Sequence, residues 1–252
     1  MNNNLITGHD RYYRQILVKE IGGQGQQKLK KSKVLVVGAG GLGAPVLFYL
    51  AASGVGTLGV VDYDTVEMSN LQRQILYKTK DIGQIKVKAA KNTIKTLNPD
   101  VKVNTYNKKI ITDADTNILS EYDIIIDGSD SIKLKNLIAR KCVKVSKTLV
   151  TGSASTWEGQ LFIYDPNNSG SCYSCIYGNQ SNNNDNDCSH LGIVGTVTGL
   201  IGSMMASETI KNIVGLSSSL TNNLFIYDGL FNEFRKIFVP KNTTCRSCNY
   251  NL

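Results

Sequence analysis

The sequence predicts an α/β protein with a doubly wound, mostly parallel sheet that continues into antiparallel strands. Between residues 33 and 150, short apolar runs alternate with segments whose apolar residues recur at helical intervals. A glycine-rich turn, "GAGGLG" (38–43), joins the first apolar run to the first helix, as in Rossmann-like folds. After residue 150 this alternation stops, and we expect the remaining apolar runs to form the antiparallel strands.

The strands are predicted from continuous apolar runs, which are typical of buried strands. They cover 33–38, 58–62, 101–106 and 123–127 in the first half of the chain, and 159–165, 223–229 and 234–240 in the second. A helix is expected from residue 44, because Pro45 is tolerated in a first turn. Two further helices are expected over 87–97, where Asn98-Pro99 stops the helix, and over 132–145.

We predict a single domain over residues 1–252, because no linker is long enough to separate two. Within it, 11–150 is the nucleotide-binding half and 151–252 the second half. The uncharged segment from Leu191 to Ser207 could pass for a membrane span, but it is short for a bilayer crossing and rich in Gly, Ser and Thr. We predict a buried helix there and no membrane association.

Charge and cysteine usage limit the partners and the compartment. Lys and Arg number 28 against 20 Asp and Glu, so the net charge is +8, which permits nucleic-acid binding. Lys and Asn are abundant along the whole chain, however, and we therefore expect compositional bias and no nucleic-acid partner. The first residues lack the pattern of a secretory signal, and the six cysteines therefore argue against a disulfide framework. We expect the protein in the cytoplasm or in the soluble interior of an organelle.

The glycine turn is the strongest sign of a nucleotide site. Gly38, Gly40 and Gly43 follow the G-x-G-x-x-G pattern, which lets the backbone approach phosphates at a helix N-terminus. Asp62 ends the next predicted strand, where a carboxylate can bind the ribose of a nucleotide. These residues do not say which nucleotide is bound.

The segment "DYDTVEMSNLQRQIL" (62–76) favours a triphosphate. If the α-phosphorus of ATP is attacked, negative charge develops on the departing pyrophosphate and must be neutralised. Arg73 and Lys86 can do this, although each basic residue taken singly would be a solvated surface charge. Asp130 follows the predicted strand 123–127 at the carboxyl edge of the sheet, where one carboxylate suits Mg²⁺ bound to phosphate oxygens.

Four of the six cysteines form two C-x-x-C pairs, Cys172/Cys175 and Cys245/Cys248. Four thiolates suit a closed tetrahedral Zn²⁺ site of structural function, which would join the end of the chain to its middle. A redox role for one pair is the alternative. Cys142 falls on the apolar face of the helix 132–145 and is expected in the core.

These features together resemble the ThiF, MoeB and HesA family of sulfur-carrier-protein adenylyltransferases, which are similar to ubiquitin-activating enzymes. The resemblance covers residues 11–248 and is carried by "RYYRQI" (11–16), "GAGGLG", "VDYDTVEMSNLQRQ" and the two Cys pairs. It implies that ATP converts the C-terminal glycine carboxylate of a small ubiquitin-like carrier, bound by the second half, into an acyl-adenylate. Such a reaction needs no general base, because a carboxylate is already ionised near neutral pH.

The resemblance also assigns residues to roles. Those implied in binding ATP and Mg²⁺ are Gly38, Gly40, Gly41, Gly43, Asp62, Ser69, Asn70, Arg73, Lys86, Asp130 and Ser131. Arg14 resembles the arginine that reaches the ATP phosphates of a neighbouring subunit, which implies a homodimer. The family commonly has Cys-Thr-Asp-Asn where this chain has Gly128-Ser129-Asp130-Ser131, so the neighbours of Asp130 depart from the family pattern.

Cys188, in the Asn-rich stretch 178–190, bears on the pathway. Members of the ThiF type use a cysteine in this region for a covalent link to the carrier during sulfur transfer; the alternative is an ordinary loop cysteine. Cys188 and the "DG" at 228–229 are closer to the thiamine-pathway type, with a ThiS-like carrier, than to the molybdopterin type, with a MoaD-like carrier. A sulfur donor protein is a further expected partner.

Two other classes of function could use the same glycine turn. A nicotinamide-dependent oxidoreductase would leave Asn70, Arg73 and the Cys pairs unexplained. A non-catalytic binding scaffold would have no use for the set of Arg14, Arg73, Lys86 and Asp130. The sequence therefore favours an enzyme, a nucleotidyltransferase.

Overall fold

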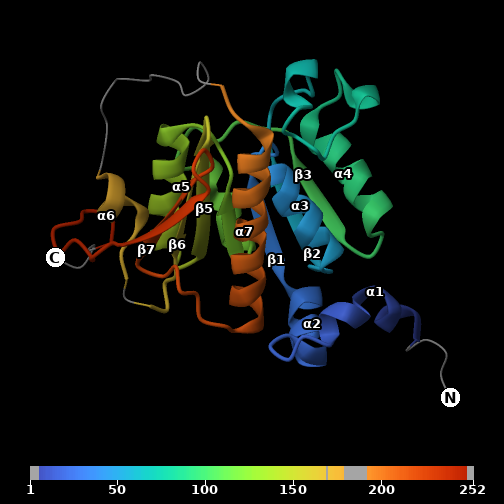
Figure 1. Ribbon diagram of the computed structural model, residues 1–252, viewed down its shortest axis with the longest axis horizontal. Coiled ribbons are helices and arrows are strands. Elements are labelled where there is room, and N and C mark those ends of the chain that lie inside the picture. Colours follow the sequence, from blue (N-terminus) through green and yellow to red (C-terminus); the bar gives the residue numbers. More distant parts are fainter. Residues whose placement is uncertain (1–5, 169, 179–191, 249–252) are drawn as a thin grey trace.

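The computed structural model describes residues 6–168, 170–178 and 192–248. One eight-stranded sheet, in the order β3-β2-β1-β4-β5-β6-β7-β8, organises these residues (Figure 1). The strands are β1 Lys33–Val37, β2 Thr57–Val61, β3 Lys102–Tyr106, β4 Ile124–Asp127, β5 Thr148–Ser155, β6 Glu158–Tyr164, β7 Asn223–Asp228 and β8 Glu233–Phe238. Pairing is parallel from β3 to β5 and antiparallel from β5 to β8, which confirms the predicted sheet.

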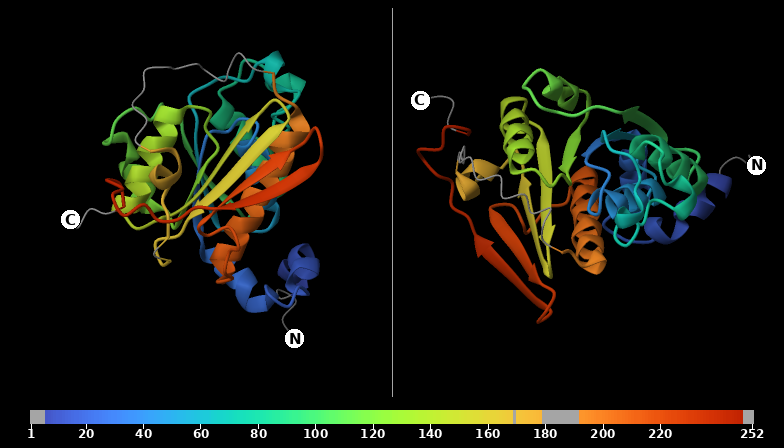
Figure 2. Two further views of the ribbon diagram at one scale, coloured as in Figure 1. Left: turned by 60° about the vertical axis from the view of Figure 1, so that its left-hand side comes forward. Right: turned by 90° about the horizontal axis from the view of Figure 1, so that it is seen from above.

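Helices cover both faces of the parallel half of the sheet (Figure 2). The helices are α1 Ile6–Ile16, α2 Gly22–Lys31, α3 Gly43–Ala52, α4 Lys86–Leu97, α5 Ile132–Lys144, α6 Tyr173–Tyr177 and α7 Gly195–Val214. Alternate residues of one strand point to opposite faces, so Val34 and Val36 pack in the core with α3, α4 and α7, whereas Leu35 and Val37 pack with α5. This division accounts for the continuous apolar runs, because both faces of each strand are buried.

The predicted strands, and the helices predicted from residue 44, over 87–97 and over 132–145, lie within two residues of those observed. The sequence pattern missed β5, since Leu149 and Val150 are its only large apolar residues and small or polar residues fill the rest. It also missed α1 and α2, whose sequences are mostly polar; α2 buries Gly25, Gln26 and Leu29. The buried helix predicted from Leu191 to Ser207 corresponds to α7, which runs on to Val214.

Close backbone contacts fix α7 between α3 and the sheet. A β-carbon on Gly202 would overlap Pro45 and lie 2.6 Å from the carbonyl oxygen of Leu42, while Ile201 packs directly over Gly159. Through these contacts α7 connects the start of α3 with the antiparallel strands. No helix within the described residues has the length and apolar character needed to cross a membrane.

The strand order reverses its direction between β1 and β4. The chain passes from β1 to β2 across one face, but β4 lies on the other side of β1 and its connection to β5 runs over the opposite face. The loops that follow β1 and β4 therefore meet at this edge, where the connections of their strands part to opposite faces, and this is where open α/β sheets bind ligands.

Candidate functional site

The glycine turn after β1 is a tight loop that only glycine permits. Gly38 has a φ of +88°, and a β-carbon on it would lie 3.0 Å from the carbonyl group of Gly128, after β4. A β-carbon on Gly43 would overlap the carbonyl oxygen of Gly38. The side chain of the N-cap residue, Leu42, does not bond the first turn of α3. The Ala44 N–H donates to the Gly40 carbonyl and Pro45 has no N–H, so an anion at this helix end would meet the N–H groups that precede Ala44.

Asp62, directly after β2, is fixed against this loop. Its Oδ2 atom accepts a hydrogen bond of 2.7 Å from the Ala39 N–H, and its Oδ1 atom accepts one of 2.9 Å from the Asp64 N–H. Tyr77 donates from its hydroxyl to the Ala39 carbonyl at 2.8 Å. Burial, followed by the nearby charges of Asp62 and Asp64, raises the pKa of Tyr77 far above its ordinary value, so this hydroxyl stays protonated and keeps donating.

The turn that begins at Asn70 is held by its own polar groups. The side chain of Asn70 is buried, and its Oδ1 atom accepts from the Glu67 N–H at 3.3 Å. Its carbonyl oxygen accepts from the N–H groups of Arg73 and Gln74. Arg73 in turn donates to the carbonyl of Ser69 at 3.1 Å, which keeps the half-buried guanidinium beside the turn.

Lys86 begins α4 and is not a solvated surface charge. Lys86 is 5% exposed, and its Nζ atom lies 2.9 Å from the Asp64 carboxylate. The Lys86 N–H also donates to the Asp64 carbonyl at 2.9 Å, so two bonds join these residues. Because a buried ammonium needs a partner, and because the positive end of the α4 dipole disfavours a cation there, Lys86 depends on the Asp64 carboxylate to hold it in place.

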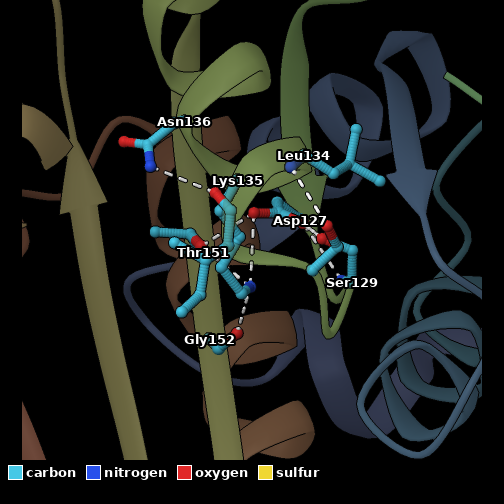
Figure 3. Close-up of polar contacts among 9 residues, drawn as sticks. Asp127, Ser129, Leu134, Lys135, Asn136, Thr151 and Gly152 are labelled. Carbon is cyan, nitrogen blue, oxygen red and sulfur yellow. Dashed lines mark hydrogen bonds and ion pairs between the residues drawn. The ribbon is translucent and has the colours of Figure 1, made fainter. Parts of the chain in front are cut away.

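A buried charged network lies under the loop after β4 (Figure 3). Asp127, the last residue of β4, is fully buried; its Oδ1 atom accepts from the Ser129 N–H at 3.0 Å and from the Ser129 hydroxyl at 2.6 Å. Its Oδ2 atom accepts from the Thr151 hydroxyl at 3.1 Å and lies 3.3 Å from Lys135 Nζ. Lys135 also donates to the Gly152 carbonyl at 2.6 Å, which ties β4, α5 and β5 together at this edge.

Asp130 and Ser131 follow in the same loop. The Asp130 side chain is exposed and makes no hydrogen bond within the described residues, which leaves its carboxylate free to bind a cation. Ser131 is the N-cap of α5, and its hydroxyl oxygen accepts from the Leu134 N–H at 3.4 Å. Its side chain therefore has a structural use in addition to the predicted contact with a nucleotide.

Arg14 lies far from these residues in the same chain. It is exposed on α1, and Tyr12 of this helix bonds Asn98 at 2.8 Å and packs against Gly54. Gly54 and Asn98 precede β2 and β3, so α1 lies at the amino edge of the sheet, opposite the glycine turn (Figure 1). The structure therefore places the residues predicted to bind ATP and Mg²⁺ at the carboxyl edge of the sheet and Arg14 at the opposite edge.

The two C-x-x-C pairs meet in one cluster. The four Sγ atoms lie within 4.8 Å of one another, with separations of 3.8 Å for Cys172–Cys175, 3.7 Å for Cys172–Cys245 and 3.6 Å for Cys175–Cys248. A tetrahedral ion with metal–sulfur bonds of about 2.3 Å would space its ligands at roughly 3.8 Å. The cluster therefore fits a single metal ion without rearrangement.

Two thiols of this cluster, those of Cys172 and Cys248, are poorly suited to stay charged without a cation, whereas burial at Cys245 is outweighed by hydrogen bonds from the N–H groups of Ser247 and Cys248, which lower its pKa. Burial, and then the other sulfur atoms, raises the pKa of Cys172 far above its ordinary value. Burial and a hydrogen bond with Cys175 raise the pKa of Cys248 to about 11. A bound cation would reverse both effects by stabilising the thiolates. Cys142 is fully buried in the core, as predicted, and Cys188 lies outside the described residues.

Sequence reasoning missed several residues that build the site. The sequence does indicate Lys135, because it lies three residues before Ile138 and seven before Cys142. This spacing places its charge on the buried side of the helix. Asp64 and Tyr77 have no such signal, because their roles come from bonds to Lys86 and Ala39 that form only in the fold.

The fold and the site define a Rossmann-like α/β protein with a cluster of four cysteines that could hold a metal ion. The chain belongs to the ThiF family, whose model matches residues 12–247. It is similar over its whole length, with 42% identity, to the adenylyltransferase and sulfurtransferase MOCS3 of Culex quinquefasciatus, of which it spans 57%.

Two further similarities agree with this assignment. The chain is 38% identical to a sulfur carrier protein adenylyltransferase of Thermus thermophilus, over 95% of this chain and 90% of that protein. The fold is shared with E. coli MccB, with a TM-score of 0.84 at 24% identity, over 95% of this chain and 74% of that one.

The sulfur cluster predicts one tightly bound metal ion per chain. Cys245→Ser should abolish stoichiometric binding, because three thiolates leave the tetrahedral site open. Cys142→Ser is the matched control, since it removes a buried thiol outside the cluster and should leave one ion per chain. Metal analysis of the purified proteins measures both; full metal content in Cys245→Ser would contradict the predicted ligand set.

Proposed function

We propose that the chain is an ATP-dependent adenylyltransferase that activates the C-terminal glycine carboxylate of a small ubiquitin-like sulfur carrier. The observation that carries this proposal is the gathering of Asp62, Asn70, Arg73 and Lys86 around one uncapped glycine turn. The relative named a sulfur carrier protein adenylyltransferase supports the same activity.

In the proposed reaction, a carboxylate oxygen of the carrier attacks the α-phosphorus of ATP. A bond forms between them, the bond from the α-phosphorus to the bridging oxygen breaks, and pyrophosphate leaves with its electron pair. Asp62 positions the ribose, the turn at 38–43 holds the phosphates, and Arg73 and Lys86 neutralise the departing charge. Mg²⁺, beside the free carboxylate of Asp130, would supply further charge neutralisation.

Two carriers fit this chemistry. We propose the thiamine-pathway, ThiS-like carrier on the strength of Cys188 and the "DG" at 228–229. The alternative is a MoaD-like carrier of the molybdopterin pathway, which the relatives named MOCS3 favour. Cys188 would form the covalent link to the carrier, and a sulfur donor protein would complete the transfer.

The second half of the chain, 151–252, is proposed to bind the carrier and one zinc ion. The β7–β8 hairpin exposes Leu230, Phe231, Phe234 and Phe238 at the end of the sheet, an apolar surface suited to a protein partner. Zinc suits four thiolates in a tetrahedral cluster and would join the chain end to the body of the fold.

A homodimer is proposed because Arg14 cannot reach the glycine turn of its own chain. α1 holds it at the amino edge of the sheet, whereas the turn lies at the carboxyl edge. A second copy could bring its Arg14 to this turn and add a cation to the phosphate site.

Carrier-dependent exchange of labelled pyrophosphate into ATP tests the function, with ThiS-like and MoaD-like carriers in parallel. Lys86→Met should lower the exchange rate about 100-fold, the effect of removing one charge-stabilising group. Lys88→Met, an exposed position on the same helix, is the matched control and should exchange normally. Cys188→Ser should also retain exchange but lose sulfur transfer.

Absence of exchange with every carrier would refute the proposed activity, and stabilisation by NAD instead of ATP would favour an oxidoreductase. Undiminished sulfur transfer by Cys188→Ser would refute the covalent role. The carrier that supports exchange decides between the two pathways. Phe231→Asp should raise the KM for that carrier, because it places a charge on the apolar surface proposed to bind it.

Mixing two inactive variants tests the dimer. Arg14→Ala and Arg73→Ala should each be inactive alone, but a heterodimer would contain one site with both arginines. Equal mixing with subunit exchange should restore about a quarter of the native exchange rate, since half the dimers would each have one intact site. No recovery, in a mixture shown to exchange subunits, would contradict a shared site.

A further inference from the structure

Gln74 is a buried amide without a structural partner. Within the described residues, three buried polar atoms make no hydrogen bond: Gln74 Oε1, Asn136 Oδ1 and Glu208 Oε2. The other polar atom of Asn136 bonds the Ile132 carbonyl, and that of Glu208 bonds Lys211. The Gln74 side chain is 4% exposed; its Oε1 atom is buried without a partner, and its Nε2 atom, which is not among the buried unpartnered atoms, makes no hydrogen bond within the described residues.

This side chain faces the glycine turn. A β-carbon placed on Gly40 would lie 3.7 Å from Gln74 Nε2, so nothing separates the amide from the turn backbone. The backbone around Gln74 is fixed, because its N–H donates to the Asn70 carbonyl at 2.9 Å and its carbonyl accepts from the Tyr77 N–H at 3.1 Å. The amide is therefore held rigidly beside the turn.

A buried amide oxygen without a partner lowers the stability of the free protein, because it has lost its bonds to water. An apolar side chain of similar size would avoid this cost, so the fold gives no reason for glutamine here. A ligand that enters beside Gly40 gives one, since an amide nitrogen can donate to a phosphate oxygen.

The part of the nucleotide nearest to Gln74 follows from Asp62. Its carboxylate accepts from Ala39, the residue before Gly40, so a ribose on Asp62 places the adjoining phosphate over Gly40. We infer that Gln74 binds the α-phosphate, the one that is attacked and stays with AMP, through its Nε2 atom. This inference rests on the proposed function and adds to it a ligand for the phosphate that reacts.

Gln74→Met tests the inference, because methionine keeps the length of the side chain and removes its polar atoms. The melting temperature of the free variant should stay unchanged or rise, whereas its Kd for AMP and for ATP should increase about tenfold or more, the loss of one hydrogen bond to a charged group. Its Kd for pyrophosphate should be native. Calorimetric titration measures all three. Gln74→Glu provides a second variant, since it keeps the shape and puts an acceptor where the donor was.

Gln160→Met is the matched control. Gln160, on β6, accepts a hydrogen bond of 2.6 Å from the Tyr177 hydroxyl, so its loss should lower the melting temperature without changing AMP affinity. Native AMP affinity in Gln74→Met and Gln74→Glu would overturn the inference, as would a fall in melting temperature that matches that of Gln160→Met. If the unchanged chain binds neither AMP nor ATP, the proposed function fails as well.

Discussion

The proposed nucleotide site depends on direct contact between two loops of backbone. The turn after β1 and the loop after β4 meet at Gly38 and Gly128, and the start of α3 folds back so that Gly43 touches Gly38. Any side chain at Gly38 or Gly43 would separate these segments. Asp62 and Tyr77 are bonded to the turn after β1, and α7 packs on the start of α3, which follows this turn. The shape of the turn therefore determines the geometry of the whole site.

Charge is arranged around this turn so that the cations are held before a nucleotide arrives. Lys86 is buried against Asp64, and Arg73 is bonded to the backbone at Ser69, so neither has to be ordered when phosphates bind. Preorganised charges of this kind stabilise a transition state without further reorganisation. Under the other loop, the buried pair of Asp127 and Lys135 fixes the segment that carries Asp130.

The sequence was sufficient for the parts of the fold that depend on local patterns. Continuous apolar runs predicted seven of the eight strands, and the Cys spacing predicted a cluster that the structure brings within 4.8 Å. β5 was not predicted because it is buried by the strands on both sides of it, β4 and β6, and contains few large apolar residues. The bonds of Asp64 and Tyr77, and the unpartnered amide of Gln74, could not be predicted because they join residues whose distance only the fold sets.

Arg14 is a predicted site residue that a single chain does not bring to the glycine turn. It is part of the motif that resembles the family, yet the fold places it at the other edge of the sheet. The glycine turn, in contrast, is complete within one chain, and the binding of ATP to it can be examined without a carrier.

Hydrogen–deuterium exchange with and without Mg-ATP locates the bound nucleotide directly. Slower exchange confined to residues 38–46, 62–64, 70–74 and 128–134 would place ATP at the junction of the β1 and β4 loops. Slower exchange elsewhere, with these segments unchanged at saturating ATP, would show that the glycine turn is not where the nucleotide binds.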